Sequence, residues 1–399
     1  MTERGGTPAV GVGVVGTGFS ARAHLDALAR LPGVRAVAVA GRDPQRVEEL
    51  GALYGLRAYT DYAELLADPA VEAVHTCTVN GLHFEVNRAA LEQGKHVLSE
   101  KPLATDSEQS AALAAAADAA AERGIVSGVC FNYRHYPMVA QMREMLRSGE
   151  HGTPHFVHGQ YLQDWMLLET DWNWRINPEE GGASRAAADI GSHWVDLAQY
   201  VIGDVVEAVL ADLSTLHPMR LRPERDTQSF EHLGAADEAE PVAVGNEDFG
   251  SVLLRFRGGA RGSFTFSQTS AGWKNGLRLQ IDAAHGAFSW DQERPDRVWV
   301  GRREGPNLEL LREPAPLLPG AARLAQLPAG HPEGWADALR NLCADFYAAV
   351  SARRDGIEHA SDVASFADGH ARVALIDAVL ASHREQRWMP VPTASGVPG

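Results

Sequence analysis

A lysine and a histidine–aspartate pair are the residues of this sequence best suited to proton-transfer chemistry. Lys101 lies in the sequence Glu100-Lys101-Pro102, directly after the apolar run His96–Leu98. Such a run is typical of a buried strand, so the lysine stands at the strand's carboxyl end, where open α/β sheets bind ligands. Asp189 and His193 are four residues apart, a spacing that places two side chains on one face of a helix.

The pair Asp189 and His193 has two interpretations. A histidine with a pKa near neutrality can take a proton from a hydroxyl group or return it, and a neighbouring carboxylate can orient the imidazole. Alternatively, Asp189 caps a helix N-terminus and His193 is satisfied within the core. The pattern alone leaves both open, and the first requires that the helix begin by Asp189.

A glycine-rich turn upstream predicts a dinucleotide site. The strand-like run Val12–Val15 leads into Gly16-Thr17-Gly18-Phe19-Ser20-Ala21, where strand becomes helix. An overlapping match that starts at Gly11 lies within the strand. Only the match at Gly16, Gly18 and Ala21 places backbone amides at a helix N-terminus, where they can hold a pyrophosphate. Together with Lys101 at a nearby strand end, this turn favours redox chemistry over nucleotide binding alone.

The residues after the second strand bear on the choice of cofactor. Ala40 is followed by Gly41-Arg42-Asp43, so glycine stands where a carboxylate would grip the ribose 2′-hydroxyl. Arg42 can pair with a 2′-phosphate, although a solvated surface arginine is an equally good interpretation, and Asp43 could reach the hydroxyls instead. We predict NAD or NADP, with a slight preference for NADP.

Four of the nine tryptophans fall within residues 165–194, interleaved with polar side chains. The group comprises Trp165, Trp172, Trp174 and Trp194 with Gln163, Asp164, Asn173 and Arg175. Flat apolar faces beside bidentate polar groups suit a polyhydroxylated ring, whereas packing between domains is the more common role of tryptophan. We expect one or two of the four to line a substrate pocket. His331, which precedes a predicted helix, could reach the same cleft.

The order of the predicted elements indicates two domains. Strands and helices alternate up to about residue 130, which predicts a doubly wound parallel Rossmann sheet. After about residue 150 most apolar segments are strand-like, which predicts an α+β domain with a mostly antiparallel sheet. We expect domains at 1–131 and 132–391, a disordered tail at 392–399, and a long loop over Pro218–Gly245.

Composition excludes several classes of protein. The 399 residues carry a formal net charge of −16, which disfavours binding to nucleic acid or anionic membranes. The three cysteines, Cys77, Cys130 and Cys343, are far apart, so we expect neither a disulfide framework nor a metal site. The polar N-terminal segment 1–8 does not look like a signal peptide, and we expect a cytoplasmic protein.

Taken together, these motifs resemble the glucose–fructose oxidoreductase and inositol dehydrogenase (Gfo/Idh/MocA) family. The matches follow the family's order along most of the chain: Gly16-Thr17-Gly18-Phe19, Thr78-Val79-Asn80 with His83, Glu100-Lys101-Pro102, Asn132-Tyr133-Arg134, and Gly181-Gly182 before Asp189-x-Gly191-x-His193-x-x-Asp196. Val79 departs from the family's usual proline, and the acid at position 41 is missing. The stretches Gln160–Trp165, which contains Tyr161, and Asp171–Arg175 resemble one bacterial subgroup.

The resemblance implies a Rossmann domain followed by an α+β domain with a large, mostly antiparallel open sheet, through which members form homodimers or homotetramers. It also implies NAD(P) and a sugar or cyclitol substrate. Lys101 then lies beside the nicotinamide and the substrate, His193 is the acid/base, and Asp189 assists it. Cofactor contacts fall on Thr78, Asn80 and Glu100, with His83 in the same motif. In the substrate pocket we place Tyr161, Gln163, Asp164, Trp165, Trp174, Arg175 and His331.

We therefore expect an oxidoreductase that reversibly oxidises a secondary hydroxyl of a sugar, glycoside or cyclitol to a ketone. Two alternatives stay open. A redox-neutral, NAD-dependent glycosidase would show no net change in nicotinamide absorbance. A non-catalytic dinucleotide sensor would be expected to have lost the catalytic residues, yet Lys101, Asp189 and His193 are all present.

Overall fold

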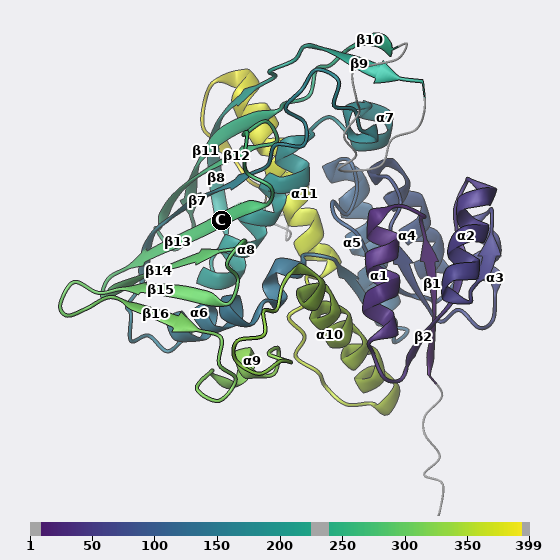
Figure 1. The fold of residues 1–399 in the computed structure, drawn as a ribbon, viewed down its shortest axis with the longest axis horizontal. Helices are drawn as coiled ribbons and strands as arrows, with labels where there is room; N and C mark the ends of the chain where they lie inside the picture. The colour runs from purple at the N-terminus through teal and green to yellow at the C-terminus, as the bar shows by residue number, and fades with distance from the viewer. Residues whose placement is uncertain (1–8, 225–238, 393–399) are drawn as a thin grey trace, which may run out of the picture.

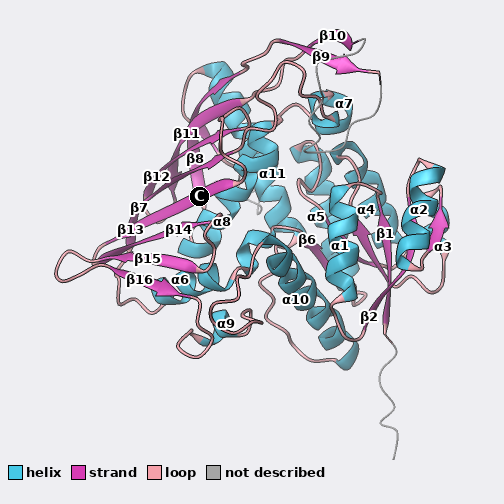
Figure 2. Ribbon diagram, in the orientation of Figure 1, coloured by secondary structure: helices cyan, strands magenta, loops and turns pink. Residues whose placement is uncertain are grey.

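Two β-sheets organise the computed structural model, which describes residues 9–224 and 239–392 (Figures 1 and 2). A six-stranded parallel sheet has the order β3-β2-β1-β4-β5-β6, and a nine-stranded sheet has the order β16-β15-β14-β13-β7-β12-β11-β8-β17. In the larger sheet β7 and β12 are parallel, and the other pairs are antiparallel. The predicted combination of a parallel Rossmann sheet and a mostly antiparallel sheet is confirmed.

The first sheet is built from short apolar strands joined by helices. Its strands are β1 (Val10–Val15), β2 (Val34–Ala40), β3 (Arg57–Tyr59), β4 (Ala73–Thr76), β5 (His96–Ser99) and β6 (Ser127–Val129). The intervening helices are α1 (Phe19–Ala29), α2 (Pro44–Tyr54), α3 (Tyr62–Ala67), the short η1 (Asn80–Leu82), α4 (His83–Glu92) and α5 (Ser107–Ala121). Because β1, β4 and β5 are parallel neighbours, the segments that follow them meet at one edge of the sheet.

The second sheet is covered by helices on its inner face, toward the first sheet (Figure 1). Its strands are β7 (Pro154–Leu162), β8 (Val206–Ser214), β11 (Phe249–Phe256), β12 (Arg261–Ser267), β13 (Gly276–Ala283), β14 (Gly286–Asp291), β15 (Arg297–Gly301), β16 (Leu308–Leu311) and β17 (Met389–Pro390). The helical segments of this half are η2 (Asn132–His135), α6 (Pro137–Arg147), η3 (Trp174–Ile176), α7 (Pro178–Gly181), η4 (Ala187–Gly191), α8 (Ser192–Ile202), α9 (Pro319–Ala322), α10 (Trp335–Asp355) and α11 (Phe366–Glu385).

Some expectations need correction or fall outside the described residues. The predicted loop 218–245 instead contains a two-stranded antiparallel ribbon, β9 (Met219–Pro223) with β10 (Ala239–Ala243). Residues 225–238 of that segment, the N-terminal segment 1–8, and residues 393–399 of the predicted tail lie outside the structure's description. None of the described helices has both the length and the apolar composition needed to cross a bilayer.

Helix α10 belongs to the predicted C-terminal domain in sequence, but it packs against the first sheet. Its residues Leu339, Leu342 and Phe346 belong to the same apolar cluster as Val10 of β1 and Leu25 of α1. A helix from the C-terminal part of the chain therefore covers the first sheet. The domain boundary between residues 131 and 132 remains a prediction. Helix α10 follows that boundary in the sequence but packs with residues that precede it.

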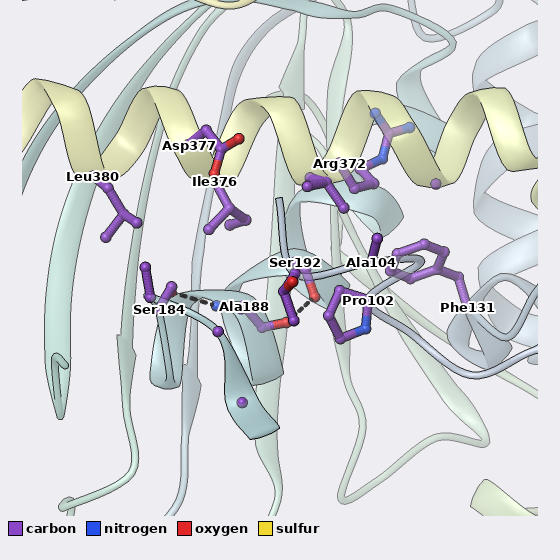
Figure 3. A pocket seen from close by; sticks show the side chains of 16 residues that line it. Pro102, Ala104, Phe131, Ser184, Ala188, Ser192, Arg372, Ile376, Asp377 and Leu380 are labelled. Carbon is purple, nitrogen blue, oxygen red and sulfur yellow. Dashed lines mark hydrogen bonds between the residues drawn. The ribbon is translucent and has the colours of Figure 1, made fainter. Parts of the chain in front are cut away.

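A buried ion-pair network fixes α8 to its neighbours. Asp196 accepts two hydrogen bonds from Arg134, at 2.8 and 2.6 Å, and one from Arg372 of α11 at 3.1 Å. Figure 3 shows α11, with Arg372, lying over the segment that begins α8 at Ser192. The cavity between them, of about 30 Å³, has room for about one water molecule. The family-like residues Arg134 and Asp196 thus hold the scaffold together.

This network gives a stability prediction. Asp196→Ala leaves two buried guanidinium groups without their carboxylate, so we expect it to cost about 3–5 kcal/mol of unfolding free energy. Urea denaturation followed by circular dichroism measures the loss. Asp212→Ala is the matched control, because the Asp212 side chain is 89% exposed. Equal stability of the two variants would show that the network does not hold α8.

Candidate active site

A cavity of about 870 Å³ lies where the carboxyl edge of the first sheet faces the helical layer of the second. Its lining from the first sheet includes Gly16, Thr17, Gly18, Phe19, Ser20, Arg42, Thr78, Asn80, His83, Glu100 and Lys101. Its lining from the second half includes Tyr133, Tyr161, Gln163, Trp174, Arg175, Asp189, His193, Lys274 and Asn275. The volume falls within the range of cofactor and small-molecule sites.

Lys101 and Asp189 join the two sides of the cavity. The Lys101 Nζ atom donates to the carbonyl oxygen and to Oδ1 of Asp189, both at 2.8 Å. Arg175 Nε lies 3.3 Å from the same Oδ1, and Gln268 donates to Oδ2 at 2.8 Å. Asp189 lies in the π-helical segment η4, before α8 begins at Ser192. The continuous helix expected from Asp189 is therefore a π-helical turn followed by an α-helix, and both Asp189 and His193 still reach the cavity.

The electrostatics keep Asp189 ionised and His193 neutral. Burial raises the pKa of the Asp189 carboxyl, but the charges of Arg175 and Lys101 outweigh burial and hold that pKa well below its usual range. Burial, followed by the charge of Lys101, lowers the pKa of His193 to about 3. His193 Nδ1 is buried and has no hydrogen-bond partner among the described residues. At neutral pH the imidazole is thus unprotonated.

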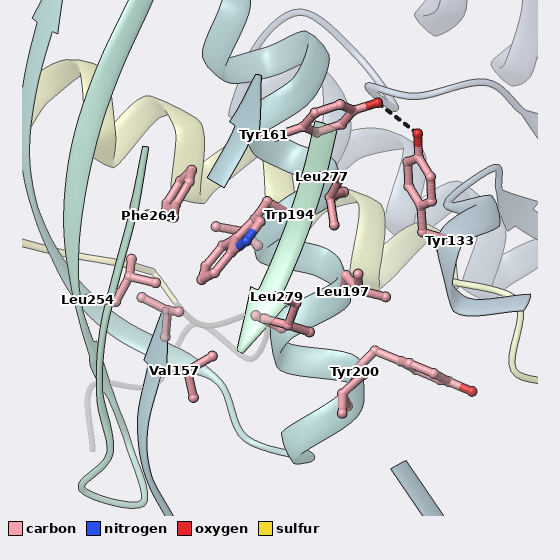
Figure 4. Packing of buried hydrophobic residues seen from close by; sticks show 14 of the residues in the cluster. Tyr133, Val157, Tyr161, Trp194, Leu197, Tyr200, Leu254, Phe264, Leu277 and Leu279 are labelled. Atoms are coloured by element: carbon pink, nitrogen blue, oxygen red, sulfur yellow. Dashed lines mark hydrogen bonds between the residues drawn. The ribbon is translucent and has the colours of Figure 1, made fainter. Parts of the chain in front are cut away.

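A polar cluster forms the wall of the cavity beside His193. The hydroxyl oxygens of Tyr133 and Tyr161, joined by a hydrogen bond in Figure 4, are 2.7 Å apart, and Tyr161 donates to Asn275 Oδ1 at 2.6 Å. Gln163 also donates to that Oδ1, at 3.0 Å, and Asn275 Nδ2 donates to the Tyr133 hydroxyl at 3.2 Å. The Tyr133 ring packs edge-on against the His193 ring, with centroids 4.8 Å apart. These hydrogen-bonding groups face the space where a ligand hydroxyl can bind.

The four clustered tryptophans have different surroundings. Trp174 lines the cavity, and the Arg175 guanidinium lies 4.3 Å from its ring centroid. Trp165 and Trp172 pack in a separate apolar cluster. Trp194 is stacked on Phe264 in the core of the second sheet, with centroids 4.6 Å apart (Figure 4).

Three residues predicted to bind substrate do not line this cavity. The indole N–H of Trp165 donates to Gln163 Oε1 at 2.8 Å, and it is Gln163, not Trp165, that lines the cavity. Asp164 accepts from Lys274 Nζ at 2.6 Å. His331 needs correction: it is exposed, its carbonyl accepts from Arg312, and its ring faces the carbonyl of Ala329. The turn before α10 points His331 away from the cleft.

Comparisons with known proteins assign the chain to a family. Residues 10–128 match the oxidoreductase family with an NAD-binding Rossmann fold, and residues 139–289 match the GFO/IDH/MocA C-terminal domain. The chain belongs to the Gfo/Idh/MocA family.

Relatives within this family match along most of the chain. Levoglucosan dehydrogenase of Pseudarthrobacter phenanthrenivorans is 32% identical over 96% of this chain and 98% of the relative. Inositol 2-dehydrogenase 3 of Saccharopolyspora erythraea is 30% identical over 56% and 60%, respectively. Among solved structures, an oxidoreductase domain protein from Kribbella flavida has a TM-score of 0.86 and 32% identity, covering 97% of this chain and 100% of that one. A levoglucosan dehydrogenase complex with NADH and L-sorbose has a TM-score of 0.84 and 28% identity, with the same coverage. As a member of this family, the chain is an NAD-dependent dehydrogenase.

The glycine turn of this Gfo/Idh/MocA member fits a dinucleotide. Gly16 has φ +128°, and a Cβ atom there would lie 2.2 Å from the carbonyl oxygen of Cys77, so only glycine fits. A Cβ on Gly18 would have nothing within 4 Å, which leaves space for a phosphate group. Helix α1 begins directly afterwards and has no side-chain cap, so its amides are available to an anion.

Other predicted cofactor residues hold the loops around this turn. His83 is buried, and its two ring nitrogens lie 2.6 Å from the carbonyl oxygen of Pro102 and 3.2 Å from that of Thr78. Asn80 donates to the carbonyl of Gly181 at 3.0 Å, which ties the first sheet to the segment before η4. Although both residues line the cavity, these polar groups are engaged with the chain itself.

Sequence reasoning missed Gln268, Lys274 and Asn275. Each follows or precedes a strand of the second sheet, and the chain around them contains no motif of their own. Tyr133 was noted only as part of a family-like motif. Gln268, Lys274 and Asn275 lie at the ends of β12 and β13, and that position is a signal that could have found them. Both strands pair with β7, and Tyr161 and Gln163 lie at the end of β7.

The low pKa of His193 predicts a pH dependence of stability. Unfolding returns the pKa of His193 from about 3 toward 6.5, so between these values the unfolded chain binds more protons and stability falls as pH decreases. His193→Gln removes this term, and we expect the slope of unfolding free energy against pH to drop by up to about 1.4 kcal/mol per pH unit. Urea unfolding from about pH 7 to 4.5 measures both slopes. Identical slopes would mean that His193 titrates normally in the folded protein.

Proposed function

We propose that this dehydrogenase oxidises a secondary hydroxyl of a neutral, polyhydroxylated ring, a sugar, glycoside or cyclitol, to a ketone, and that the reaction is reversible. The observation that carries the proposal is the meeting of Lys101, Asp189 and His193 in one cavity, opposite the glycine turn. The names of the relatives support the substrate class, since they include dehydrogenases of levoglucosan and inositol.

The charges around the ligand space support a neutral substrate. Lys101 and Arg175 both contact the carboxylate of Asp189, and Lys274 contacts that of Asp164. Each of these three cations thus already contacts a carboxylate, that of Asp189 being shared by Lys101 and Arg175, and this partial neutralisation favours a substrate without phosphate. Hydroxyls and amides of Tyr133, Gln163 and Asn275 are the groups expected to bind ring hydroxyls.

The proposed roles follow from the contacts. Lys101 donates to the reacting oxygen and stabilises its developing alkoxide charge. His193 takes the hydroxyl proton on its neutral ring, while the charge of Asp189 stabilises the imidazolium that forms. NAD, when bound along the glycine turn, supplies a hydride acceptor. In the reverse direction His193 returns the proton to the oxygen that Lys101 polarises.

A turnover screen tests this function. We expect reduction of NAD or NADP with levoglucosan, unphosphorylated sugars or inositols, and at least about tenfold lower kcat/KM for glucose 6-phosphate than for glucose. Lys101→Ala and His193→Ala should each cost about two to four orders of magnitude in kcat. Near-native turnover of either folded variant would overturn the assignment. Glycoside cleavage without net nicotinamide absorbance change would instead support the redox-neutral alternative.

We also propose a slight preference for NADP. A Cβ at Gly41 would lie 2.6 Å from Thr17 Cγ2, which disfavours a carboxylate there, and Asp43 is occupied as the N-cap of α2. Arg42 and Arg46 line the cavity at this end, and Arg42 is 76% exposed beside Glu180. The levoglucosan dehydrogenase structure named above holds NADH, so the preference depends on residues 41–46 of this chain.

Steady-state kinetics with both cofactors measure this preference. Arg42→Ala removes the proposed partner of the 2′-phosphate, so we expect at least about a tenfold loss of kcat/KM for NADP and little change for NAD. Wild-type efficiency that is nearly equal for the two cofactors would remove the proposal.

The outer face of the second sheet supports self-association as a homodimer or homotetramer. Helices cover the inner face (Figure 1), whereas Phe156, Leu253 and Trp299 are 36%, 47% and 39% exposed on the other. Large apolar side chains on an open sheet face are typical of an interface. Light scattering coupled to gel filtration should give a multiple of the 43.0 kDa chain mass, and Leu253→Lys should reduce it. A monomer at micromolar concentration would contradict this proposal.

A further inference from the structure

Beneath the cofactor cavity, a chain of buried polar side chains leads to Glu100. The Tyr347 hydroxyl of α10 lies 2.9 Å from His75 Nε2, and His75 Nδ1 lies 2.8 Å from His24 Nδ1. His24 Nε2 lies 3.2 Å from Glu100 Oε1. Both histidines are fully buried, and Tyr347 is 4% exposed. These four residues come from α10, β4, α1 and the end of β5, so the chain runs along the face of the first sheet that α1 and α10 cover.

Two sets of proton positions satisfy every hydrogen bond in this chain. Glu100 is an acceptor, so His24 Nε2 carries the proton that faces it in both sets. With no second proton on His24, its Nδ1 accepts from His75 Nδ1, and His75 Nε2 accepts from the Tyr347 hydroxyl; with a second proton, both of these bonds run the other way. Burial lowers the pKa of His75 well below its usual value, and a neutral His75 ring fits both sets. In each set the chain ends with His24 donating to Glu100.

Glu100 connects this chain to the active site. Its second oxygen, Oε2, accepts from the Lys101 backbone N–H at 3.1 Å, and its side chain, 13% exposed, lines the cavity. Burial raises the pKa of Glu100, but the hydrogen bond from His24 and the positive charge beside the carboxylate outweigh burial and lower the pKa to about 2. The carboxylate is thus ionised and held from both sides, directly beside Lys101.

We propose that His24, His75 and Tyr347 are positioning residues that hold Glu100 as an oriented anion at the cofactor end of the cavity. Through Glu100 they set the cofactor's affinity, and through the Lys101 N–H they fix where the lysine leaves the strand. Nothing in the proposed proton transfer uses these residues directly. The proposal deepens the proposed function, but it is tested on cofactor binding, which does not depend on the substrate.

The same residues could instead hold a metal ion, and the geometry favours the hydrogen-bonded chain. Ligand atoms of His24, His75 and Cys343 lie within 4.8 Å of one another, despite their distance in sequence. However, the two Nδ1 atoms are 2.8 Å apart, closer than the roughly 3.3 Å between two nitrogen ligands of tetrahedral zinc. Cys130 forms a second such group with His24 and Glu100, and burial raises the pKa of both the Cys130 and Cys343 thiols far above the usual value, which disfavours the thiolate that binds metals.

A double-mutant cycle on NADH affinity, read by nicotinamide fluorescence, tests the proposal. His24→Ala should raise the Kd for NADH by about tenfold, since a hydrogen bond to a charged group is lost. In a Glu100→Gln background, His24→Ala should change the Kd for NADH by less than about twofold, because its effect passes through Glu100. His24→Gln keeps an amide donor and should recover most of the affinity. Tyr347→Phe should give a smaller loss in the same direction.

The control is His96→Ala on the same strand as Glu100. His96 lies at the amino end of β5 and accepts from the Val126 N–H at 2.9 Å, away from the cavity. We expect it to change thermal stability without changing the NADH Kd. Additive effects of His24→Ala and Glu100→Gln would overturn the proposal, and so would one equivalent of zinc per chain that is lost in His75→Ala. If no sugar is turned over in the screen but the double-mutant cycle gives the expected coupling, only the proposed substrate is wrong.

Discussion

The contact between Lys101 and Asp189 is the interaction on which the site depends. Lys101 comes from the end of a strand in the first sheet, and Asp189 comes from the helical layer of the second. A partly buried ion pair repays the cost of its desolvation only when additional hydrogen bonds satisfy the charges. Here Arg175 and Gln268 satisfy the remaining positions of the carboxylate. The pair therefore joins the two sheets across the cavity, and its lysine charge adds to burial in keeping His193 neutral.

Several residues of the family's motifs bond to other parts of the chain and so hold in place the segments that line the cavity. Asp196 anchors α8 through Arg134 and Arg372, and His83 ties together the loops at Thr78 and Pro102. Such groups are buried and hydrogen-bonded to the chain, so removing one lowers the stability of the fold as well as the activity. A motif in the sequence does not distinguish these scaffold residues from those that contact ligands.

The sequence predicted the parts of the fold and site that depend on local chemistry. The first sheet follows from apolar strands alternating with helices, and the edge at which Gly16, Thr78 and Lys101 meet follows from parallel pairing. The candidates that line the cavity mostly fall on such strand ends. Placement of α10 against the first sheet and pairing of β9 with β10 depend on contacts between distant segments, which periodicity does not encode.

Long-range contacts also explain the errors within the site. His331 and Asn275 have similar local surroundings in the sequence, since each lies beside a glycine. Only the register of β13 against β7 decides that Asn275 faces Tyr161, and the hydrogen bonds of Arg312 turn the His331 segment elsewhere. The three cysteines were likewise treated as unrelated, although Cys130 and Cys343 both lie near His24 in the structure.

The hydrogen-bonding capacity of Lys101 constrains how a ligand can bind. An ammonium group has three donors, and Asp189 accepts two of them, through its carbonyl and Oδ1 oxygens. One donor is therefore left for a ligand oxygen, in a direction set by the tetrahedral nitrogen and the two contacts. Because Asp189 is itself held by Arg175 and Gln268, that direction cannot adjust freely to the ligand. With the roles proposed for Lys101 and His193, the hydroxyl that reacts is the one that lies along the third donor and within reach of His193, so the choice of oxidised carbon becomes a geometric property of this ion pair.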